Sequence, residues 1–201
     1  MMRGVTRLFW ATARGSAAVI LVACTATTSS SSAPEPAQSG PSNTIRPCSA
    51  TDLSLAGRWQ GGTGSLAGGL RLDVTAPTSC ALPGQLQLEL VDGQGQSLSV
   101  DEVAAPDLCE DMQSGTGCVS QDMVEVEPGQ SALVRVAWQN WCGAPPSGYV
   151  GVEVILPSEP LPVSAPMTDA FGTSSADTPR CDAPDVPSTL AVGPVAVADG
   201  A

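Results

Sequence analysis

Apolar and polar residues alternate along several short segments of this chain, and that pattern restricts the folds open to it. In one segment Leu86, Leu88 and Leu90 are separated by glutamine and glutamate. Such a period of two is typical of a strand with one buried face, because successive side chains of a strand point to opposite faces. The alternating segments are 53–59, 70–74, 86–90, 98–100, 124–126, 132–138, 150–156 and 190–197. They predict an all-β fold, an antiparallel sandwich of seven or eight strands.

Two segments interrupt this alternation and are predicted to be long loops. Residues 101–122 are acidic and surround Cys109 and Cys118, whereas residues 157–187 are rich in proline, serine and aspartate and contain Cys181. Long loops in a compact domain are usually functional or flexible. The cysteines in both segments predict that disulfide bonds pin these loops to the strands.

The first 23 residues have the organisation of a lipoprotein signal peptide. Arg3, Arg7 and Arg14 make this start positive, and 17–23 form an apolar run. The run is too short to cross a bilayer, which takes about 20 residues. It leads into the sequence Leu-Val-Ala-Cys at 21–24, the pattern of a bacterial lipobox, in which cleavage leaves an N-terminal cysteine that carries lipid. The alternative is an ordinary cleaved signal peptide followed by a chance cysteine.

Lipid on Cys24 predicts a protein held on the extracytoplasmic face of the cell membrane. Residues 24–47 combine this cysteine with a segment rich in serine, threonine and proline. That segment lacks the large apolar residues needed for folding and is predicted to be a flexible tether. The expected organisation is a signal peptide at 1–23, a lipidated tether at 24–47 and one β-sandwich domain at 48–201.

The exported part of the chain is strongly acidic. All eight cationic residues are arginines, and three of them belong to the predicted signal peptide. The remaining five arginines stand against 20 aspartates and glutamates, which gives the exported part a net charge of −15. Such a surface repels phosphate backbones, so nucleic acid is not an expected partner. The chain has neither histidine nor lysine, which removes Ser-His pairs and lysine bases. We therefore expect no enzymatic activity, and the weaker alternative is a pair of carboxylates that cleaves wall polysaccharide.

Six cysteines remain once Cys24 is assigned to lipid, and an even number in an exported domain indicates disulfide bonds. They are Cys48, Cys80, Cys109, Cys118, Cys142 and Cys181. Many connectivities are possible for six cysteines, and the order of the strands favours the pairs Cys48–Cys80, Cys109–Cys118 and Cys142–Cys181. No Cys-x-x-Cys pair is present, so zinc sites and redox motifs are not expected.

The acidic segment offers oxygen ligands of the kind that calcium takes. Its carboxylates are Asp101, Glu102, Asp107, Glu110 and Asp111. They do not follow the Asp-x-Asp-x-Asp-Gly spacing of a calcium loop, so a solvated charged face is the favoured interpretation. We expect no metal and no cofactor.

The tryptophans and the tyrosine divide into core positions and candidate contacts. Trp59 and Trp138 fall in phase with the inward positions of their strands and are predicted to lie in the core. Trp141 and Tyr149 flank the loop at 142–148. They are candidate contacts for a glycan or a peptide, because sugars and prolines stack on flat apolar rings. The alternative is that both pack on the disulfide of Cys142.

Several short motifs carry a resemblance to a known family. They are Cys48-Ser49-Ala50-Thr51-Asp52-Leu53, Cys80-Ala81-Leu82-Pro83-Gly84 and Glu127-Pro128-Gly129-Gln130-Ser131-Ala132, followed by Trp138, Cys142 and Cys181. With these motifs, residues 48–198 resemble domain of unknown function 4232, a family common in exported lipoproteins of actinobacteria. The resemblance implies an immunoglobulin-like β-sandwich with no known activity. The chain departs from the family pattern before Cys80, where an asparagine is common, and in the Cys109–Cys118 segment, which looks like an insertion.

These features predict a membrane-anchored lipoprotein of the cell envelope whose sandwich domain binds another molecule without catalysing a reaction. Its expected partners are the membrane, through the lipid on Cys24, and an envelope protein or glycan. A purely structural or stress-protective envelope protein is the alternative function.

Overall fold

The computed structural model describes residues 45–61, 64–109, 121–157 and 159–198, which all belong to one compact unit of the chain, residues 43–201. This part consists of strands and one 3-10 turn, without an α-helix. None of its helical segments has the length and apolar character needed to cross a lipid bilayer. The elements are η1 (Ala50–Asp52), β1 (Leu53–Gly61), β2 (Ser65–Val74), β3 (Cys80–Pro83), β4 (Gln87–Asp92), β5 (Asp101–Ala104), β6 (Met123–Val126), β7 (Ser131–Gln139), β8 (Val150–Ile155), β9 (Val163–Thr168), β10 (Thr189–Val192) and β11 (Ala196–Ala198).

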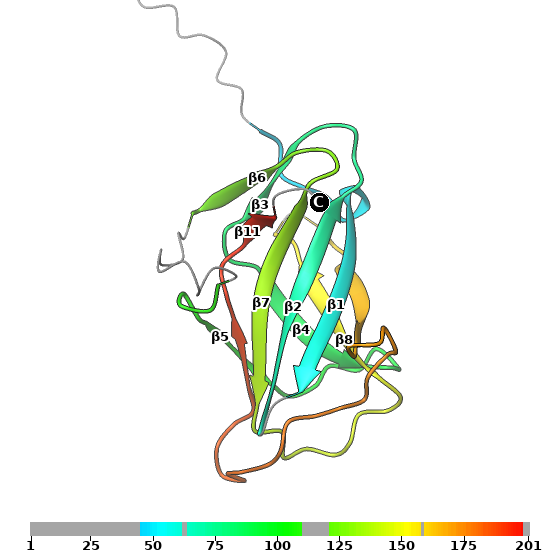
Figure 1. Cartoon of the computed structure of the whole chain (residues 1–201), viewed down its shortest axis with the longest axis vertical. Coiled ribbons are helices and arrows are strands. Elements are labelled where there is room, and N and C mark those ends of the chain that lie inside the picture. The colour runs from blue at the N-terminus through cyan, green and yellow to red at the C-terminus, as the bar shows by residue number, and fades with distance from the viewer. Residues whose placement is uncertain (1–44, 62–63, 110–120, 158, 199–201) are drawn as a thin grey trace, which may run out of the picture. The chain divides into compact units, whose positions relative to one another are not determined.

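Nine of the eleven strands in the described part form one sheet. Its order is β4-β8-β9-β1-β2-β7-β10-β5, with β11 beside the start of β7, and β3 pairs with β6 separately. Neighbouring strands are antiparallel except in the β1–β9 and β10–β5 pairs. The long strands β1, β2 and β7 lie side by side and form the broadest surface of the sheet (Figure 1). The prediction of an all-β, mainly antiparallel domain is confirmed.

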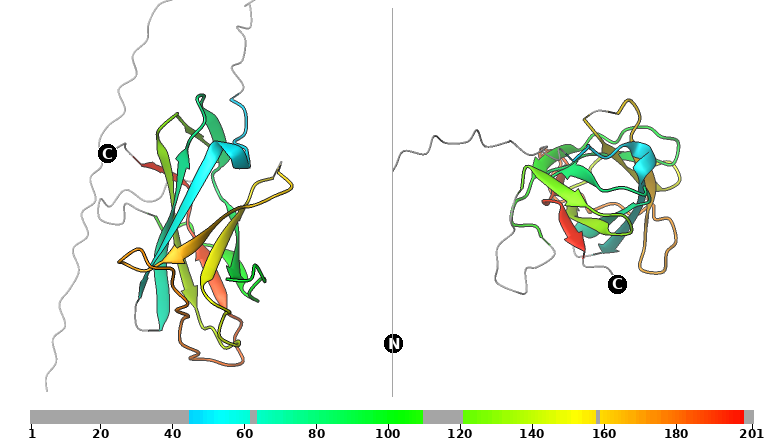
Figure 2. Two further views of the ribbon diagram at one scale, coloured as in Figure 1. Left: turned by 90° about the vertical axis from the view of Figure 1, so that its right-hand side faces the viewer. Right: turned by 90° about the horizontal axis from the view of Figure 1, so that it is seen from above.

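The nine-stranded sheet curls around the core until its end strands meet. β4 and β5 stand at opposite ends of the strand order, yet the Leu88 amide of β4 donates a hydrogen bond of 2.5 Å to the Glu102 carboxylate of β5. On the other side, β9 pairs with β8 and, through Gly57 and Arg58, with β1. The sheet is therefore almost closed, and the view from above in Figure 2 shows its strands around a common centre. It differs from the predicted immunoglobulin-like sandwich of two separate sheets because β9 joins the two layers.

The core lies inside the curled sheet and follows the predicted alternation. Trp59 and Trp138 are 3% and 0% exposed, so their predicted core positions are confirmed. Trp138 is the middle of an aromatic row, because its ring centroid lies 6.3 Å from that of Trp59 and 5.4 Å from that of Trp141. Its indole nitrogen donates a hydrogen bond of 2.8 Å to the Ser188 hydroxyl, which satisfies the polar atom of this buried side chain.

Three strands, β3, β5 and β9, were not predicted. β5 and β9 lie within the two segments predicted as loops. Neither has a clear apolar alternation, since all four residues of β5 are exposed and β9 contains Pro166. Conversely, Leu98 and Val100 alternate but belong to no strand, and they pack against the core as part-buried residues. For β5 the pattern fails because an exposed strand at the end of the sheet has no buried face. β9 lies inside the sheet, but only Met167 of its six residues is buried, so its sequence shows no alternation either.

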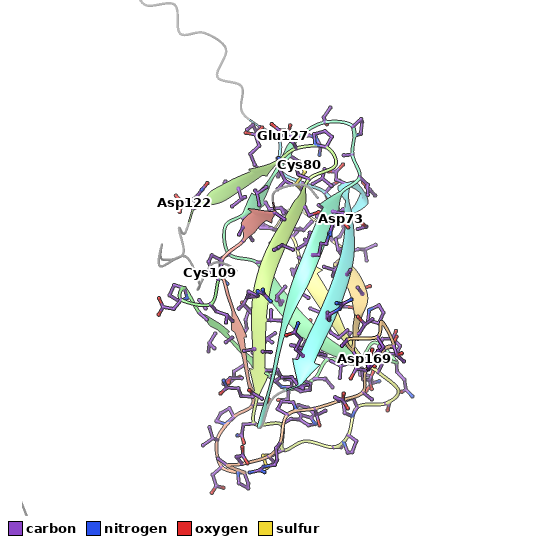
Figure 3. The ribbon with its side chains drawn as sticks, viewed as in Figure 1. Asp73, Cys80, Cys109, Asp122, Glu127 and Asp169 are labelled. Carbon is purple, nitrogen blue, oxygen red and sulfur yellow. A yellow bond between two sulfur atoms is a disulfide. The ribbon has the colours of Figure 1, made fainter. Side chains whose placement is uncertain are left out.

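Disulfide bonds hold the ends of the sheet to neighbouring segments. The described bonds are Cys48–Cys80 and Cys142–Cys181, with Cα separations of 4.9 and 4.8 Å. These are the pairs that the strand order favours, and Cys80 lies where β2 ends and β7 begins (Figure 3). Cys109 is disulfide-bonded as well, and Cys118, its predicted partner, lies outside the described residues. Each bond should stabilise the domain by about 3–4 kcal/mol, mainly by restricting the unfolded chain.

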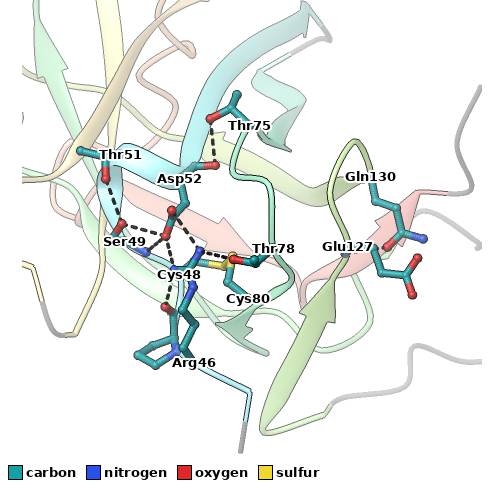
Figure 4. The surroundings of a disulfide bond; sticks show 11 residues. Arg46, Cys48, Ser49, Thr51, Asp52, Thr75, Thr78, Cys80, Glu127 and Gln130 are labelled. Carbon is teal, nitrogen blue, oxygen red and sulfur yellow. Dashed lines mark hydrogen bonds and ion pairs between the residues drawn. A yellow bond between two sulfur atoms is a disulfide. The ribbon is translucent and has the colours of Figure 1, made fainter. Parts of the chain in front are cut away.

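A hydrogen-bonded clasp surrounds the Cys48 disulfide (Figure 4). The Arg46 guanidinium donates to both oxygens of Asp52, at 2.5 and 3.1 Å, and also reaches the Thr78 hydroxyl at 3.2 Å. The Ser49 amide and hydroxyl each donate to the same carboxylate at 2.7 Å. The Arg46 guanidinium and the two Ser49 donors hold the pKa of Asp52 well below its ordinary value, against the opposing effect of burial. The Cys-Ser-x-x-Asp motif therefore fixes how the chain enters β1.

We predict that Asp52→Asn lowers the free energy of unfolding at pH 7 by about 1 kcal/mol, because hydrogen bonds to a charged but partly solvated group are lost. Since the folded pKa of Asp52 is depressed, the difference from the parent persists down to about pH 4, the ordinary pKa of an unfolded aspartate. It shrinks below that pH, because the unfolded aspartate gains a proton while the folded carboxylate is still charged, and it is lost once the folded carboxylate is protonated as well. Urea unfolding at pH 7 and pH 3 measures both effects.

The exposed Asp107 supplies the control variant for this experiment, Asp107→Asn. It should unfold like the parent at both pH values. A stability of Asp52→Asn equal to that of the parent at pH 7 would contradict the role of the clasp.

Candidate functional site

The outer face of β1, β2 and β7 carries three arginines, one on each strand. Arg58, Arg71 and Arg135 are each flanked along the strand by buried residues, so strand geometry turns their side chains outward. Strand pairing then brings them together. Gly69 of β2 pairs with Arg58 on one side and with Arg135 on the other, and Arg71 follows two residues later on the same face. We name the hollow around these four residues the arginine groove.

The arginine groove is an open hollow of about 380 Å³. Three of its eleven lining residues are arginines, and none is an aspartate or glutamate, although acidic residues outnumber arginines 20 to 5 in residues 24–201. Thr168 of β9 lines one side of the groove, and its hydroxyl donates to the Gly57 carbonyl at 2.9 Å. A hollow lined by charges of one sign concentrates their field and attracts ions of the opposite sign.

Arg71 is held in place from one end of the groove. Its Nε lies 2.7 Å from the Asp73 carboxylate, and the Ser131 hydroxyl of β7 donates to the same oxygen at 2.5 Å. Burial raises the pKa of Asp73, but the hydrogen bonds from Ser131 and Arg71 outweigh it and leave the pKa below its ordinary value. Asp73 lies near one end of β2 in Figure 3. This carboxylate therefore stays charged at neutral pH and orients the guanidinium of Arg71.

The other two arginines border Gly69. Within the described part of the chain the Arg58 side chain forms no ion pair or hydrogen bond. An Nη atom of Arg135 lies 3.9 Å from the point that a Cβ atom on Gly69 would occupy, so this guanidinium extends over the glycine. The floor between Arg58 and Arg135 is thus bare backbone.

The two aromatic candidates from the sequence do not share a surface. Trp141 is half-buried against Trp138, its indole nitrogen donates to the Ala144 carbonyl at 3.1 Å, and it lines a hollow of about 270 Å³. Tyr149 is 38% exposed and lines a different hollow of about 160 Å³, which includes Asp92. The structure therefore does not bring Trp141 and Tyr149 together as one ligand contact.

Asn140 organises the hollow around Trp141 and was not singled out in the sequence. It is the one non-glycine residue with a positive φ, 57°, in the described part. Its side chain accepts hydrogen bonds from the amides of Asp182 and Ala183, at 3.1 and 2.9 Å, and donates to the carbonyls of Ala183 and Val186. Asparagine tolerates this left-handed conformation better than most residues. It fastens the loop after Cys181 to the end of β7, which is a structural role.

The acidic segment is only partly described. Glu102 accepts the Leu88 hydrogen bond that joins the sheet ends, whereas Glu110 and Asp111 lie outside the described residues. Among the described residues, no three histidine, cysteine, aspartate or glutamate side chains gather as metal ligands would.

The arginine groove is not among the sites predicted from the sequence, although part of its pattern is present there. The sequence predicts that each arginine points outward, because each one lies between apolar residues of an alternating segment. The sequence does not predict that the arginines lie close together, because their proximity depends on the pairing of β7 with β2, two strands that are far apart in the sequence.

The comparisons with known proteins fit this architecture. The model of the family described as Domain of unknown function (DUF4232) matches residues 48–196, a span that contains the arginine groove and both described disulfides. No curated protein and no solved structure matches the chain. Because the family model covers most of the sequence, the chain belongs to the DUF4232 family.

Proposed function

We propose that this protein is a lipid-anchored component of the cell envelope whose β-domain binds another molecule without catalysing a reaction. The lipobox that ends at Cys24 and the tether that follows support anchoring on the extracytoplasmic face of the membrane. The disulfide bonds support an oxidising compartment outside the cytoplasm. The arginine groove is the binding site in this proposal.

The observation that carries the proposal is the gathering of three of the five mature arginines around one hollow without an acidic lining residue. Positive charges gathered around one hollow repel one another, although the Asp73 carboxylate offsets the charge of Arg71, so the arrangement is not explained by a gain in sheet stability. An anionic group in the groove would remove the repulsion. The net charge of −15 on the exported chain also makes this face the natural docking point for a negative group, because the rest of the domain repels it.

A purely structural or stress-protective envelope protein is the competing function. The Arg71–Asp73 ion pair favours it, since that pair gives one groove arginine an internal role. A carboxylate-dependent hydrolase of wall polysaccharide is a third function. Release of reducing ends from purified cell wall by the parent protein would indicate the hydrolase.

We predict that Cys24→Ala moves the protein from the membrane fraction into the culture medium, because the variant has no thiol to acylate. Fractionation of cells followed by immunoblotting measures the shift. Ser29→Ala, a change within the tether, should leave the protein in the membrane. Retention of Cys24→Ala in the membrane would argue against lipid anchoring.

We predict that the full-length protein captures a saturable partner from envelope extract and that Arg58→Ala weakens this capture about tenfold, as expected for the loss of a charge-assisted contact. Arg180→Ala is the matched control, because Arg180 is exposed and paired with Asp182 away from the groove. It should bind like the parent.

The double variant Trp141→Ala, Tyr149→Ala separates the groove from the aromatic candidates. We expect this variant to retain capture. Loss of capture in this variant with full capture by Arg58→Ala would assign binding to the aromatic residues. Absence of any saturable partner would favour the structural function.

A further inference from the structure

We propose that the arginine groove holds a single oxyanion group, a carboxylate or a phosphate carried by an otherwise neutral small molecule, over Gly69 and between Arg58 and Arg135. This inference rests on the proposed binding function and adds the chemistry of the ligand. Three features support it: unused space at Gly69, the arrangement of the guanidinium groups, and the charge of the surrounding domain.

Gly69 leaves space that the fold does not require. Its backbone is outside the left-handed region, and a Cβ atom there would meet only ordinary contacts, 3.7 Å from the Val134 carbonyl and 3.9 Å from Arg135. The preceding Gly68 differs, because a Cβ atom on it would lie 2.2 Å from the Arg58 carbonyl. Glycine weakens a strand interior and often marks a bulge, a tight bend, or a place where a ligand or another backbone approaches closely. Gly69 lies in regular pairing with both neighbouring strands and has no backbone atom closer than 3.7 Å to its Cβ position, which favours the approach of a ligand.

The guanidinium groups border this space from several sides. Neighbouring strands lie about 4.8 Å apart, so the backbones of β1 and β7 stand about 10 Å from each other across Gly69. Arg58 and Arg135 line the groove from these two strands, and an Nη atom of Arg135 lies over Gly69. Arg71 lies on the diagonal, about 7–8 Å from each of them along the sheet. Arginine binds carboxylates and phosphates with paired N–H groups, so a small oxyanion over Gly69 fits this arrangement.

The charge of the domain restricts the ligand to one or a few negative groups. Screening limits the reach of each exposed charge to about 8 Å at physiological salt. A dense polyanion extends beyond that distance and meets the acidic surface, which repels it. A small ligand stays within the groove, and the groove volume of about 380 Å³ lies in the range of small-molecule sites.

An extended acidic peptide fits the groove less well. Peptides that bind to sheets usually add a strand to a free edge. Next to the groove, β2 and β7 have a paired strand on both sides, and β1 pairs with β9 at Gly57 and Arg58, so the sheet offers no free edge beside Arg58. A peptide would have to bind through its carboxylates alone.

The test is calorimetric titration of the full-length protein with glucuronate, glucose 6-phosphate and glucose at constant ionic strength. We expect saturable binding of at least one of the two anions and no binding of glucose. Binding of glucuronate alone or of glucose 6-phosphate alone would assign the group as carboxylate or phosphate. Binding of glucose as tight as that of the anions, or binding of neither anion, would overturn the proposal.

Two variants locate the site. Gly69→Val should weaken binding about tenfold or more by filling the floor and displacing contacts to the ligand, while its thermal midpoint stays at or above that of the parent, because valine suits a strand better than glycine. Arg180→Ala should bind like the parent. Full binding by a folded Gly69→Val variant would exclude the position over Gly69.

The titration and the capture experiment can fail separately. One outcome is that an envelope partner is captured through Arg58 while neither anion binds. This outcome would support the proposed binding function and refute the proposal that the ligand group is a small oxyanion. Much tighter binding of poly-glutamate than of the small anions would refute the restriction to a sparsely charged ligand.

Discussion

The register of β2 between β1 and β7 is the constraint on which the rest of the structure depends. β2 pairs through nine residues with each of these neighbours. Because side chains alternate, a slip of β7 by one residue against β2 would expose Trp138 and turn Arg135 into the core, where an unpaired charge is too costly to bury. One pairing therefore fixes both the aromatic row inside the sheet and the arginine groove outside it.

The parts of the fold that could be predicted from the sequence are the strands with one buried face, because apolar and polar residues alternate along them. β7 alternates along its whole length because one face is buried and the other is not, and the pairing of Cys48 with Cys80 follows from strand order. The closure of the sheet could not be predicted, because no alternation of apolar and polar residues marks it in the sequence. It depends on the short pairing of β9 with β1 and on the Leu88–Glu102 hydrogen bond between the end strands, and these are long-range contacts between segments with little alternation of their own.

The candidate site was less predictable because it is a property of strand order. Trp141 and Tyr149 are close in sequence, yet they line different hollows. Arg58 and Arg135 are distant in sequence, yet the same glycine pairs with both. Gly69 gave no signal on its own, because the adjacent Gly68 is required by close contacts and Gly69 is not. The two glycines differ only in their surroundings in the folded chain: a side chain at Gly68 would collide with the backbone of Arg58, whereas Gly69 leaves the groove open.

A negatively charged domain that keeps most of its arginines around one hollow is suited to small anionic groups and resists large polyanions. The direct test of this claim is an NMR titration of the arginine Nε–Hε signals with glucose 6-phosphate and with glucuronate at constant ionic strength. With the anion that binds, the signals of Arg58, Arg71 and Arg135 should shift together and saturate at one concentration, while those of Arg46 and Arg180 stay in place. Shifts of all five that grow equally and without saturation would contradict a shared binding groove.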